Sequence, residues 1–339
     1  MRTNLTLAAA ALSGAALLAA CSGNGLTGMQ SAVPGVQSQL RNSQFAPERT
    51  GVAPQYLQML RFGQAPYVRP DTHPDVSKLA DIAVSDWGSG AVEVLNPSYK
   101  LAETITDGLN GPDGDYYDAK GNLYVADYAG VNVTEYSKTG KLTHTYSVDL
   151  LDPVNVTVDK KNHVFVADYA SGQPSVVVEY PQGRDNPIAS CSTKLANEGV
   201  VVDSKGDVFV SGNNSNGTAN IIEYKGGLKG CKATMLKVPL GYAGGLQLDA
   251  KQNLVVCDQT IGVDIVPPPY KSVGSTIKGG QDSFHVALDA ANTTIFIADP
   301  SSDADVLVDK YPSGGRIATL GSKNGLTDPS GVATYSTLK

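Results

Sequence analysis

A short phrase recurs along this chain, and its period limits the fold more than any other feature of the sequence. Residues 122–127 read Asn-Leu-Tyr-Val-Ala-Asp, and close variants of this phrase end at Asp86, Asp168, Gly212, Asp258 and Asp299. The six end positions are separated by 41, 41, 44, 46 and 41 residues. A period of this length indicates one supersecondary unit that is repeated and packed against its copies. The sequence therefore predicts a repeat architecture of six units.

Each unit has the composition of four short β-strands. In the third unit the segments Val154–Asp159, His163–Ala167, Ser175–Tyr180 and Ile188–Cys191 are separated by residues that favour turns. The second of these segments is apolar at nearly every position, so both of its faces must be covered. About four strands per 40–45 residues is the pattern of a propeller blade. We therefore predict an all-β fold, a six-bladed β-propeller.

The two ends of the repeat region complement each other. The first copy of the phrase, Leu79–Asp86, has no preceding strand of the Val154–Asp159 type. The C-terminal segment Asp328–Tyr335 aligns with Asp152–Asp159 and supplies that strand. We expect it to be the innermost strand of the first blade, so that the C-terminal strand closes the ring and removes an exposed sheet edge.

The fuller repeat, roughly Pro-x-Gly-hydrophobic-x-x-Asp-x-x-Gly-Asn-hydrophobic-Tyr-Val-Ala-Asp, is carried best by Gly121–Asp127 and Gly331–Tyr335. It resembles the NHL-type six-bladed β-propeller family over about residues 77–339. The resemblance implies the fold and leaves the function open, because such propellers include binding scaffolds and some enzymes.

The N-terminus has the pattern of a bacterial lipoprotein leader. Arg2 precedes the apolar stretch Leu5–Ala20, which is too short to remain as a membrane span. The stretch ends in Leu-Ala-Ala-Cys at Cys21, which resembles a lipobox and implies cleavage before Cys21 and lipidation of its thiol. The alternative is an ordinary signal peptide with an incidental cysteine. Ser22 follows, which favours a periplasmic or outer-membrane position in the cell envelope.

Three regions follow from these patterns. We expect a signal peptide at residues 1–20 and a lipidated, flexible tether at residues 21–76, which are rich in Gly, Ser, Gln, Pro and Ala. The propeller is predicted at residues 77–339. The net charge of −7 and the isoelectric point near 5.1 argue against nucleic acid as a partner, since a nucleic-acid scaffold would show a basic face. Membrane attachment is expected through the N-terminal lipid only.

Three cysteines remain after Cys21. Cys191 and Cys231 are predicted in the outer parts of adjacent blades, and an oxidising compartment favours a disulfide between them. The alternative is two free thiols. Cys257 stands where the other copies have Ser or Ala, so we interpret it as a buried small side chain.

The repeated aspartates have a structural interpretation, because an Asp at a strand end accepts backbone N–H groups of the following turn. The residues that break the repeat are better candidates for a site. At the starts of the innermost strands, where Gly is the default, we expect four polar side chains to converge: Asp113, Asn155, Glu198 and His285. The oxygens of Asp113, Asn155 and Glu198 suit Ca²⁺, and the alternative is a hydrated polar channel.

This arrangement is similar to gluconolactonase-type propellers, which implies a divalent cation held by inner-strand residues. The flanking motifs of that family are absent. In this interpretation the protein is a calcium-dependent, lactonase-like hydrolase, and His285 is the candidate base.

Three aromatic residues follow the second strands of consecutive blades: Trp87, Tyr128 and Tyr169. They are predicted either to form a binding platform beside the channel or to pack between blades. No catalytic sequence motif is present. We therefore predict a lipid-anchored, extracytoplasmic binding or scaffold module for an envelope protein, a peptide or a glycan, with the lactonase-like enzyme as the alternative. A structural envelope protein without a discrete ligand is the third interpretation.

Overall fold

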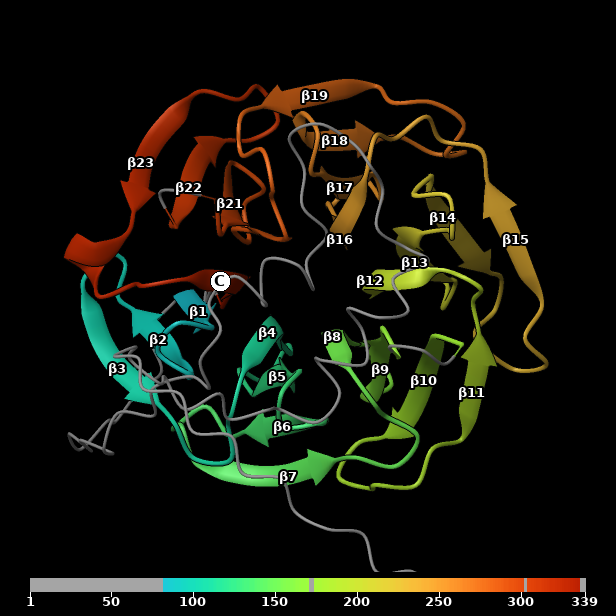
Figure 1. Cartoon of the computed structure of the whole chain (residues 1–339), viewed down its shortest axis with the longest axis horizontal. Coiled ribbons are helices and arrows are strands. Elements are labelled where there is room, and N and C mark those ends of the chain that lie inside the picture. Colours follow the sequence, from blue (N-terminus) through green and yellow to red (C-terminus); the bar gives the residue numbers. More distant parts are fainter. Residues whose placement is uncertain (1–81, 171–173, 302–303, 336–339) are drawn as a thin grey trace, which may run out of the picture. The chain divides into compact units, whose positions relative to one another are not determined.

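Six antiparallel sheets of four strands surround a central axis in the computed structural model, which describes residues 82–170, 174–301 and 304–335 (Figure 1). The predicted leader, the tether and the lipidation site Cys21 lie outside the described residues. Within the described residues the secondary structure is almost entirely β, with one short 3-10 helix, η1 (Ser322–Asn324). The predicted six-bladed β-propeller is confirmed.

Blades 1 to 3 follow one another along the chain, each with its innermost strand first. Blade 1 has the strands β24 (Pro329–Thr334), β1 (Ile82–Asp86), β2 (Ala91–Leu95) and β3 (Leu101–Ile105). Blade 2 has β4 (Pro112–Tyr117), β5 (Leu123–Asp127), β6 (Asn132–Tyr136) and β7 (Leu142–Tyr146). Blade 3 has β8 (Pro153–Val158), β9 (His163–Asp168), β10 (Val176–Pro181) and β11 (Ala189–Ser192).

Blades 4 to 6 repeat the same order. Blade 4 has β12 (Ala196–Val202), β13 (Val208–Asn213), β14 (Ala219–Tyr224) and β15 (Ala233–Leu236). Blade 5 has β16 (Ala243–Leu248), β17 (Leu254–Asp258), β18 (Gly262–Val266) and β19 (Ser275–Lys278). Blade 6 has β20 (His285–Leu288), β21 (Thr294–Asp299), β22 (Asp305–Lys310) and β23 (Arg316–Leu320).

The recurring phrase is the second strand of every blade. In β5 all five residues are buried, and β9 is buried at every position after His163. Burial on both faces requires apolar residues at alternate and intervening positions alike, which explains why the phrase does not alternate. Neighbouring blades supply the cover, since Val125 of blade 2 shares a core cluster with Val92 and Val94 of blade 1.

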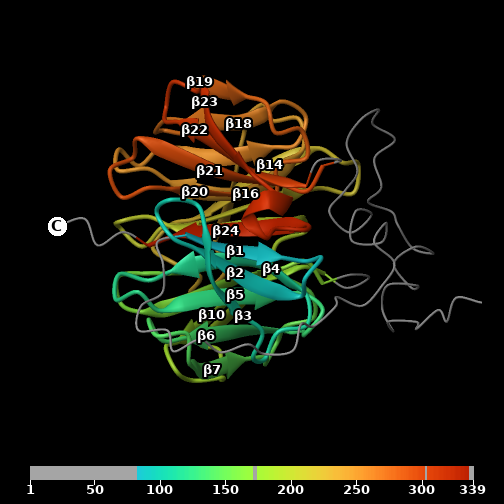
Figure 2. The same ribbon diagram turned by 90° about the vertical axis from the view of Figure 1, so that its left-hand side faces the viewer.

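The ring is closed by the last strand, as the sequence predicts. β24 pairs antiparallel with β1, with Ile82 opposite Thr334 and Ser85 opposite Gly331. Figure 2 shows the red β24 beside the cyan β1. The pairing joins the two ends of the propeller and leaves the first blade without an open inner edge.

The repeated aspartates cap turns, which confirms their structural interpretation. At the end of β5, the carboxylate of Asp127 accepts the backbone N–H groups of Asn110 and Gly111. After the innermost strands, four upstream aspartates accept the N–H groups two and four residues later in their own turns: Asp118, Asp159, Asp203 and Asp249. Their lone pairs are therefore engaged by the backbone.

A disulfide joins blades 3 and 4. Cys191 in β11 is bonded to Cys231, in the turn before β15, with a Cα–Cα distance of 5.5 Å. Cys257 in β17 is a free thiol with no exposed surface, in keeping with the small side chains at the equivalent positions. Among the described residues, no helix has the length and apolar character needed to span a membrane.

Candidate functional site

The innermost strands line a channel along the axis of the ring (Figure 1). We call the end where these strands begin the first mouth, and the end where they finish the second mouth. The predicted site residues lie near the first mouth. A cavity lies toward the second.

Three polar side chains meet at the first mouth. Nε2 of His285 lies 3.3 Å from Oδ1 of Asp113, and Nδ1 of His285 lies 3.1 Å from Nδ2 of Asn155. The exposed fractions of His285, Asp113 and Asn155 are 3%, 0% and 7%. Innermost strands of blades 2, 3 and 6 therefore bring these residues together in the interior, although His285 is 130 residues from Asn155 in the chain.

Hydrogen bonds determine which nitrogen of His285 carries the proton. The backbone N–H of Val200 donates to Oδ1 of Asn155 over 3.0 Å, so the amide nitrogen of Asn155 is the atom that faces the imidazole. An amide –NH2 group only donates, so Nδ1 of His285 accepts and the proton of the neutral ring is on Nε2. That N–H is directed at the carboxylate of Asp113.

Glu198 completes this cluster. Its side chain is 2% exposed, and its Oε1 atom has no hydrogen-bond partner among the described residues. Burial, and then the nearby charge of Asp113, raise the pKa of Glu198 well above its usual range. Since two neighbouring carboxylates in a dry interior disfavour a second charge, the cluster favours a protonated Glu198.

Glycines allow the innermost strands to approach closely at the first mouth. A Cβ added to Gly114 would lie 2.5 Å from the carbonyl oxygen of Val154 in the next blade, and one added to Gly331 would overlap the carbonyl oxygen of Asp113. The default glycine at this position of the repeat is thus a packing requirement. Asn155 and His285 depart from it, and both make polar contacts there.

The calcium hypothesis for Asp113, Asn155 and Glu198 does not fit this geometry. Within the described residues, no group of three or more His, Cys, Asp or Glu side chains is placed to hold a metal ion. The only oxygen that the Asn155 side chain has for a ligand bond accepts the N–H of Val200. Calcium requires about six to eight oxygen ligands, so this correction removes the basis for a cation between these residues.

His285 does not fit the role of a catalytic base. One ring nitrogen accepts from Asn155 and the other carries a proton toward Asp113, so neither has a free lone pair for a substrate. A base must also reach the proton that it removes, and this ring is buried. The lactonase-like alternative therefore loses its proposed base.

The aromatic platform also requires a correction. Tyr128 and Tyr169 are each 7% exposed and belong to one core cluster, with Trp87 partly buried against it. The rings of Trp87 and Tyr128 meet edge to face, with centroids 6.0 Å apart. A platform needs exposed ring faces, whereas these rings fill the space between blades 1 to 4.

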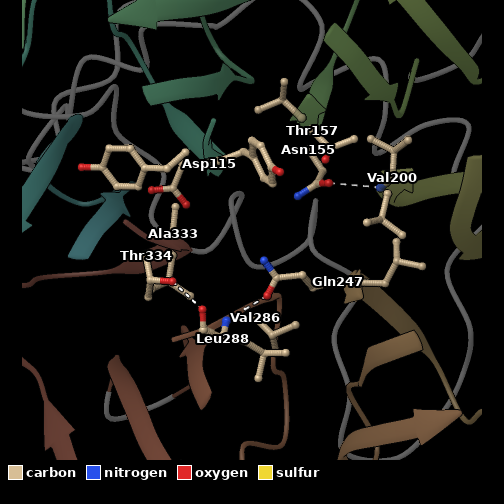
Figure 3. Close-up of a pocket in the computed structure, with 15 residues that line it drawn as sticks. Asp115, Asn155, Thr157, Val200, Gln247, Val286, Leu288, Ala333 and Thr334 are labelled. Carbon is tan, nitrogen blue, oxygen red and sulfur yellow. Dashed lines mark hydrogen bonds between the residues drawn. The ribbon is translucent and has the colours of Figure 1, made fainter. Parts of the chain in front are cut away.

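A cavity of about 200 Å³ lies in the channel toward the second mouth. Residues from the innermost strands of all six blades line it, and Figure 3 shows Asp115, Asn155 and Gln247 with their polar ends toward its interior. At about 30 Å³ per molecule this space would hold six or seven waters, which suits one inserted group of a ligand.

The polar groups of the cavity have defined roles. Oε1 of Gln247 accepts the backbone N–H of Leu288 over 2.8 Å, which leaves its Nε2 donor for the cavity. Burial raises the pKa of Asp115 well above its usual range; a hydrogen bond from Ser85 opposes this shift and the charge of Asp113 adds to it. A protonated Asp115 can both donate and accept. The walls between these groups are apolar, from Val156, Val200 and other aliphatic side chains.

Sequence reasoning did not identify Asp115 and Gln247, although the signal was present. The residue after the default glycine is aliphatic in five blades and is Asp115 in blade 2. One position later stands Gln247, the only amide in that column. Extending the comparison of repeat-breaking positions by two residues would have found both.

Comparisons with known proteins support the architecture. A nidogen/laminin complex contains a chain that matches with a TM-score of 0.60 and 17% identity over 75% of this chain and 97% of that chain. Virginiamycin B lyase from Staphylococcus aureus matches with a TM-score of 0.47 and 14% identity over 61% of this chain and 68% of that chain. At these identities the likeness concerns the fold alone.

No protein-family model matches the sequence, and no curated protein matches it.

Proposed function

We propose that this protein is a lipid-anchored, extracytoplasmic binding module of the NHL type, and that its ligand site is the cavity at the second mouth. The observation that carries the proposal is convergence. Innermost strands of all six blades contribute to one cavity that contains a carboxyl group, an amide donor and apolar walls. Ligand sites in proteins typically combine an apolar concave surface with a few polar groups that fix orientation.

The chemistry of the cavity favours a neutral polar group of the ligand. Raised pKa values of Asp115 and Glu198 mean that this part of the channel carries little charge near neutral pH. A neutral amide or hydroxyl group can accept from Nε2 of Gln247 and exchange a hydrogen bond with Asp115. Such groups occur in glutamine and asparagine side chains and in N-acetylated sugars, which agrees with a protein, peptide or glycan partner.

Binding is favoured over turnover by what surrounds the cavity. Both ring nitrogens of His285 are engaged, and Asn155 is held by Val200 on one side and by His285 on the other. A preformed site whose polar groups are already oriented loses little freedom when a ligand is bound.

The ligand proposal is tested by isothermal titration of the full chain with N-acetylglucosamine and with N-acetylglutamine amide, and with butylamine and acetate as charged probes. We expect heat of binding from at least one neutral probe and none from the charged ones. The Gln247→Glu variant keeps an oxygen for the N–H of Leu288 and removes the donor, so it should weaken the neutral probe about tenfold. Equal binding by the variant would disprove the site.

Asp115→Asn separates two forms of the site. If Asp115 acts as a neutral group, an isosteric amide retains binding of the neutral probe within a few fold. Loss of that binding together with affinity of the unmodified protein for butylamine would show a charged carboxylate and overturn the neutral-ligand assignment.

The anchor is tested separately through Cys21. Cys21→Ala should abolish incorporation of labelled palmitate and release the protein from the membrane fraction of the envelope. Labelling that persists in the variant would contradict lipidation at this cysteine.

A further inference from the structure

We propose that the rim of the second mouth is a basic docking face for a membrane surface that contains anionic phospholipid. The cavity is not needed for this contact. The inference uses the proposed lipid anchor only to orient the face.

The turns that follow the innermost strands carry exposed lysines in four consecutive blades. They are Lys120 in blade 2, Lys160 and Lys161 in blade 3, Lys205 in blade 4 and Lys251 in blade 5. Each turn directly follows an innermost strand, so these side chains surround the second mouth. Within the residues that the structure describes, no ion pair joins any of them to a carboxylate.

The acidic groups of the same turns lie beneath the lysines. Asp118, Asp203 and Asp249 are 4%, 9% and 6% exposed, and each accepts two backbone N–H groups of its turn. Their charge is therefore directed inward to the turn, whereas the lysine ammonium groups are in solvent. The outermost layer of this face is cationic.

The basic layer extends outward from the rim. The N–H of Gly226 donates to Asp207 next to the blade 4 turn, which brings the adjacent, exposed Lys225 to this face. In blade 5 the hydroxyl of Tyr270 donates to the carbonyl oxygen of Gln252, which does the same for Lys271. A net charge of −7 conceals this separation, because acidic residues are concentrated elsewhere.

The path of the chain favours a membrane as the partner. Ile82 pairs with Thr334, the last residue of β24, so the chain enters the first blade at the second mouth. The residues before it include the proposed anchor Cys21. An anchor attached through this face turns the lysines toward the bilayer. Cations distributed over four blades around a ring also suit a planar anionic surface, where each basic residue contributes about 1 kcal/mol of attraction.

The test is sedimentation of the full chain with vesicles. Phosphatidylcholine vesicles report any contribution of the apolar N-terminal stretch, and vesicles with about 30 mol % phosphatidylglycerol add the anionic surface. We expect much tighter binding to the anionic vesicles, with the difference lost at about 0.5 M salt, where charges are screened within a few ångströms.

Two matched variants locate the face. The rim variant carries Lys120→Gln, Lys161→Gln, Lys205→Gln and Lys251→Gln. The control variant removes four charges elsewhere, at or near the connections to the next blade: Lys194→Gln, Lys237→Gln, Lys278→Gln and Lys323→Gln. At about fivefold per lysine, the rim variant should lose roughly several-hundred-fold of its partitioning to anionic vesicles, and the control variant should keep most of it.

Two results would overturn the proposal. Equal losses in both variants would mean that net charge, and not this face, controls binding. Binding of heparin or a DNA oligonucleotide that depends on the rim lysines, without binding to anionic vesicles, would assign the face to a soluble polyanion. The cavity proposal would survive either result, because its test measures neutral probes in solution.

Discussion

The side-chain amide of Asn155 donates a hydrogen bond to Nδ1 of His285 over 3.1 Å, across the interior of the channel. Its oxygen accepts the backbone N–H of Val200 in a third blade. One side chain thus connects blades 3, 4 and 6 and also fixes the protonation of the imidazole. This pairing explains why both residues depart from the default glycine without having a catalytic role.

Asn155→Leu should destabilise the propeller by about 2–5 kcal/mol, because it leaves two buried groups, the N–H of Val200 and Nδ1 of His285, without partners. Urea unfolding followed by circular dichroism measures the loss. The exposed Asn186→Ala is the control and should change the free energy of unfolding by less than about 0.5 kcal/mol. Similar values for the two variants would refute the structural role of Asn155.

Gly331→Ala tests the close approach of the innermost strands. The added Cβ would overlap the carbonyl oxygen of Asp113, so the strands must separate, and we expect a loss of roughly 3 kcal/mol or more. Gly183→Ala is the comparison: nothing lies within 4 Å of its Cβ, and its positive φ of 66° alone costs about 1 kcal/mol. Thermal unfolding of both variants separates steric overlap from backbone strain. The packing argument fails if Gly331→Ala is the milder change.

Removal of the disulfide should have a large effect. The bond between Cys191 and Cys231 closes a loop with a sequence separation of 40, which corresponds to about 4 kcal/mol in the chain-entropy model. The double variant Cys191→Ala/Cys231→Ala should therefore lose about that free energy of unfolding, and dithiothreitol should lower the melting temperature of the unmodified protein only. A reductant effect of equal size on the double variant would point to a different cause.

Stability should fall as the pH rises from about 4 to 7. Burial raises the pKa of Asp168 to about 7, and burial, together with the charge of Asp86, raises that of Asp328 to about 7. A folded-state pKa above the unfolded value near 3.9 means that the native state binds more protons between these pH values, so the free energy of unfolding decreases through this window.

Melting temperatures at pH 5 and pH 8 measure this dependence, and the value at pH 5 should be the higher. Asp328→Asn removes one of the two groups, whose Oδ1 has no hydrogen-bond partner among the described residues, and should flatten the pH profile. A melting temperature that rises between pH 5 and pH 8 would show that these carboxyls are ionised in the folded state.

The repeat predicted the fold because strand pairing and blade packing act on every copy in the same way. The apolar phrase requires two covered faces, and the unpaired Leu79–Asp86 segment requires a closing strand. These constraints are local and are repeated six times. The four strands predicted in the third unit, for example, agree with β8 to β11 to within about two residues.

The site was less predictable because it depends on side-chain directions within the channel. The sequence placed Asp113, Asn155, Glu198 and His285 near one another, but it could not show that the Asn155 oxygen turns toward Val200. The fate of Tyr128 and Tyr169 depends on how adjacent blades pack, which the order of residues does not specify. Net charge misled for the same reason, since it contains no information on which turns share a face.

Closure by β24 makes the finished propeller depend on the part of the ring that is synthesised last. Until residues 329–334 arrive, β1 has an open inner edge and the cavity lacks the wall formed by Val332, Ala333 and Thr334. Any chain that stops short of this strand therefore lacks both a complete ring and a complete ligand site, and its unpaired edge marks it for proteolysis or aggregation. The fold thus contains its own check that translation has reached the end of the domain before the protein can function.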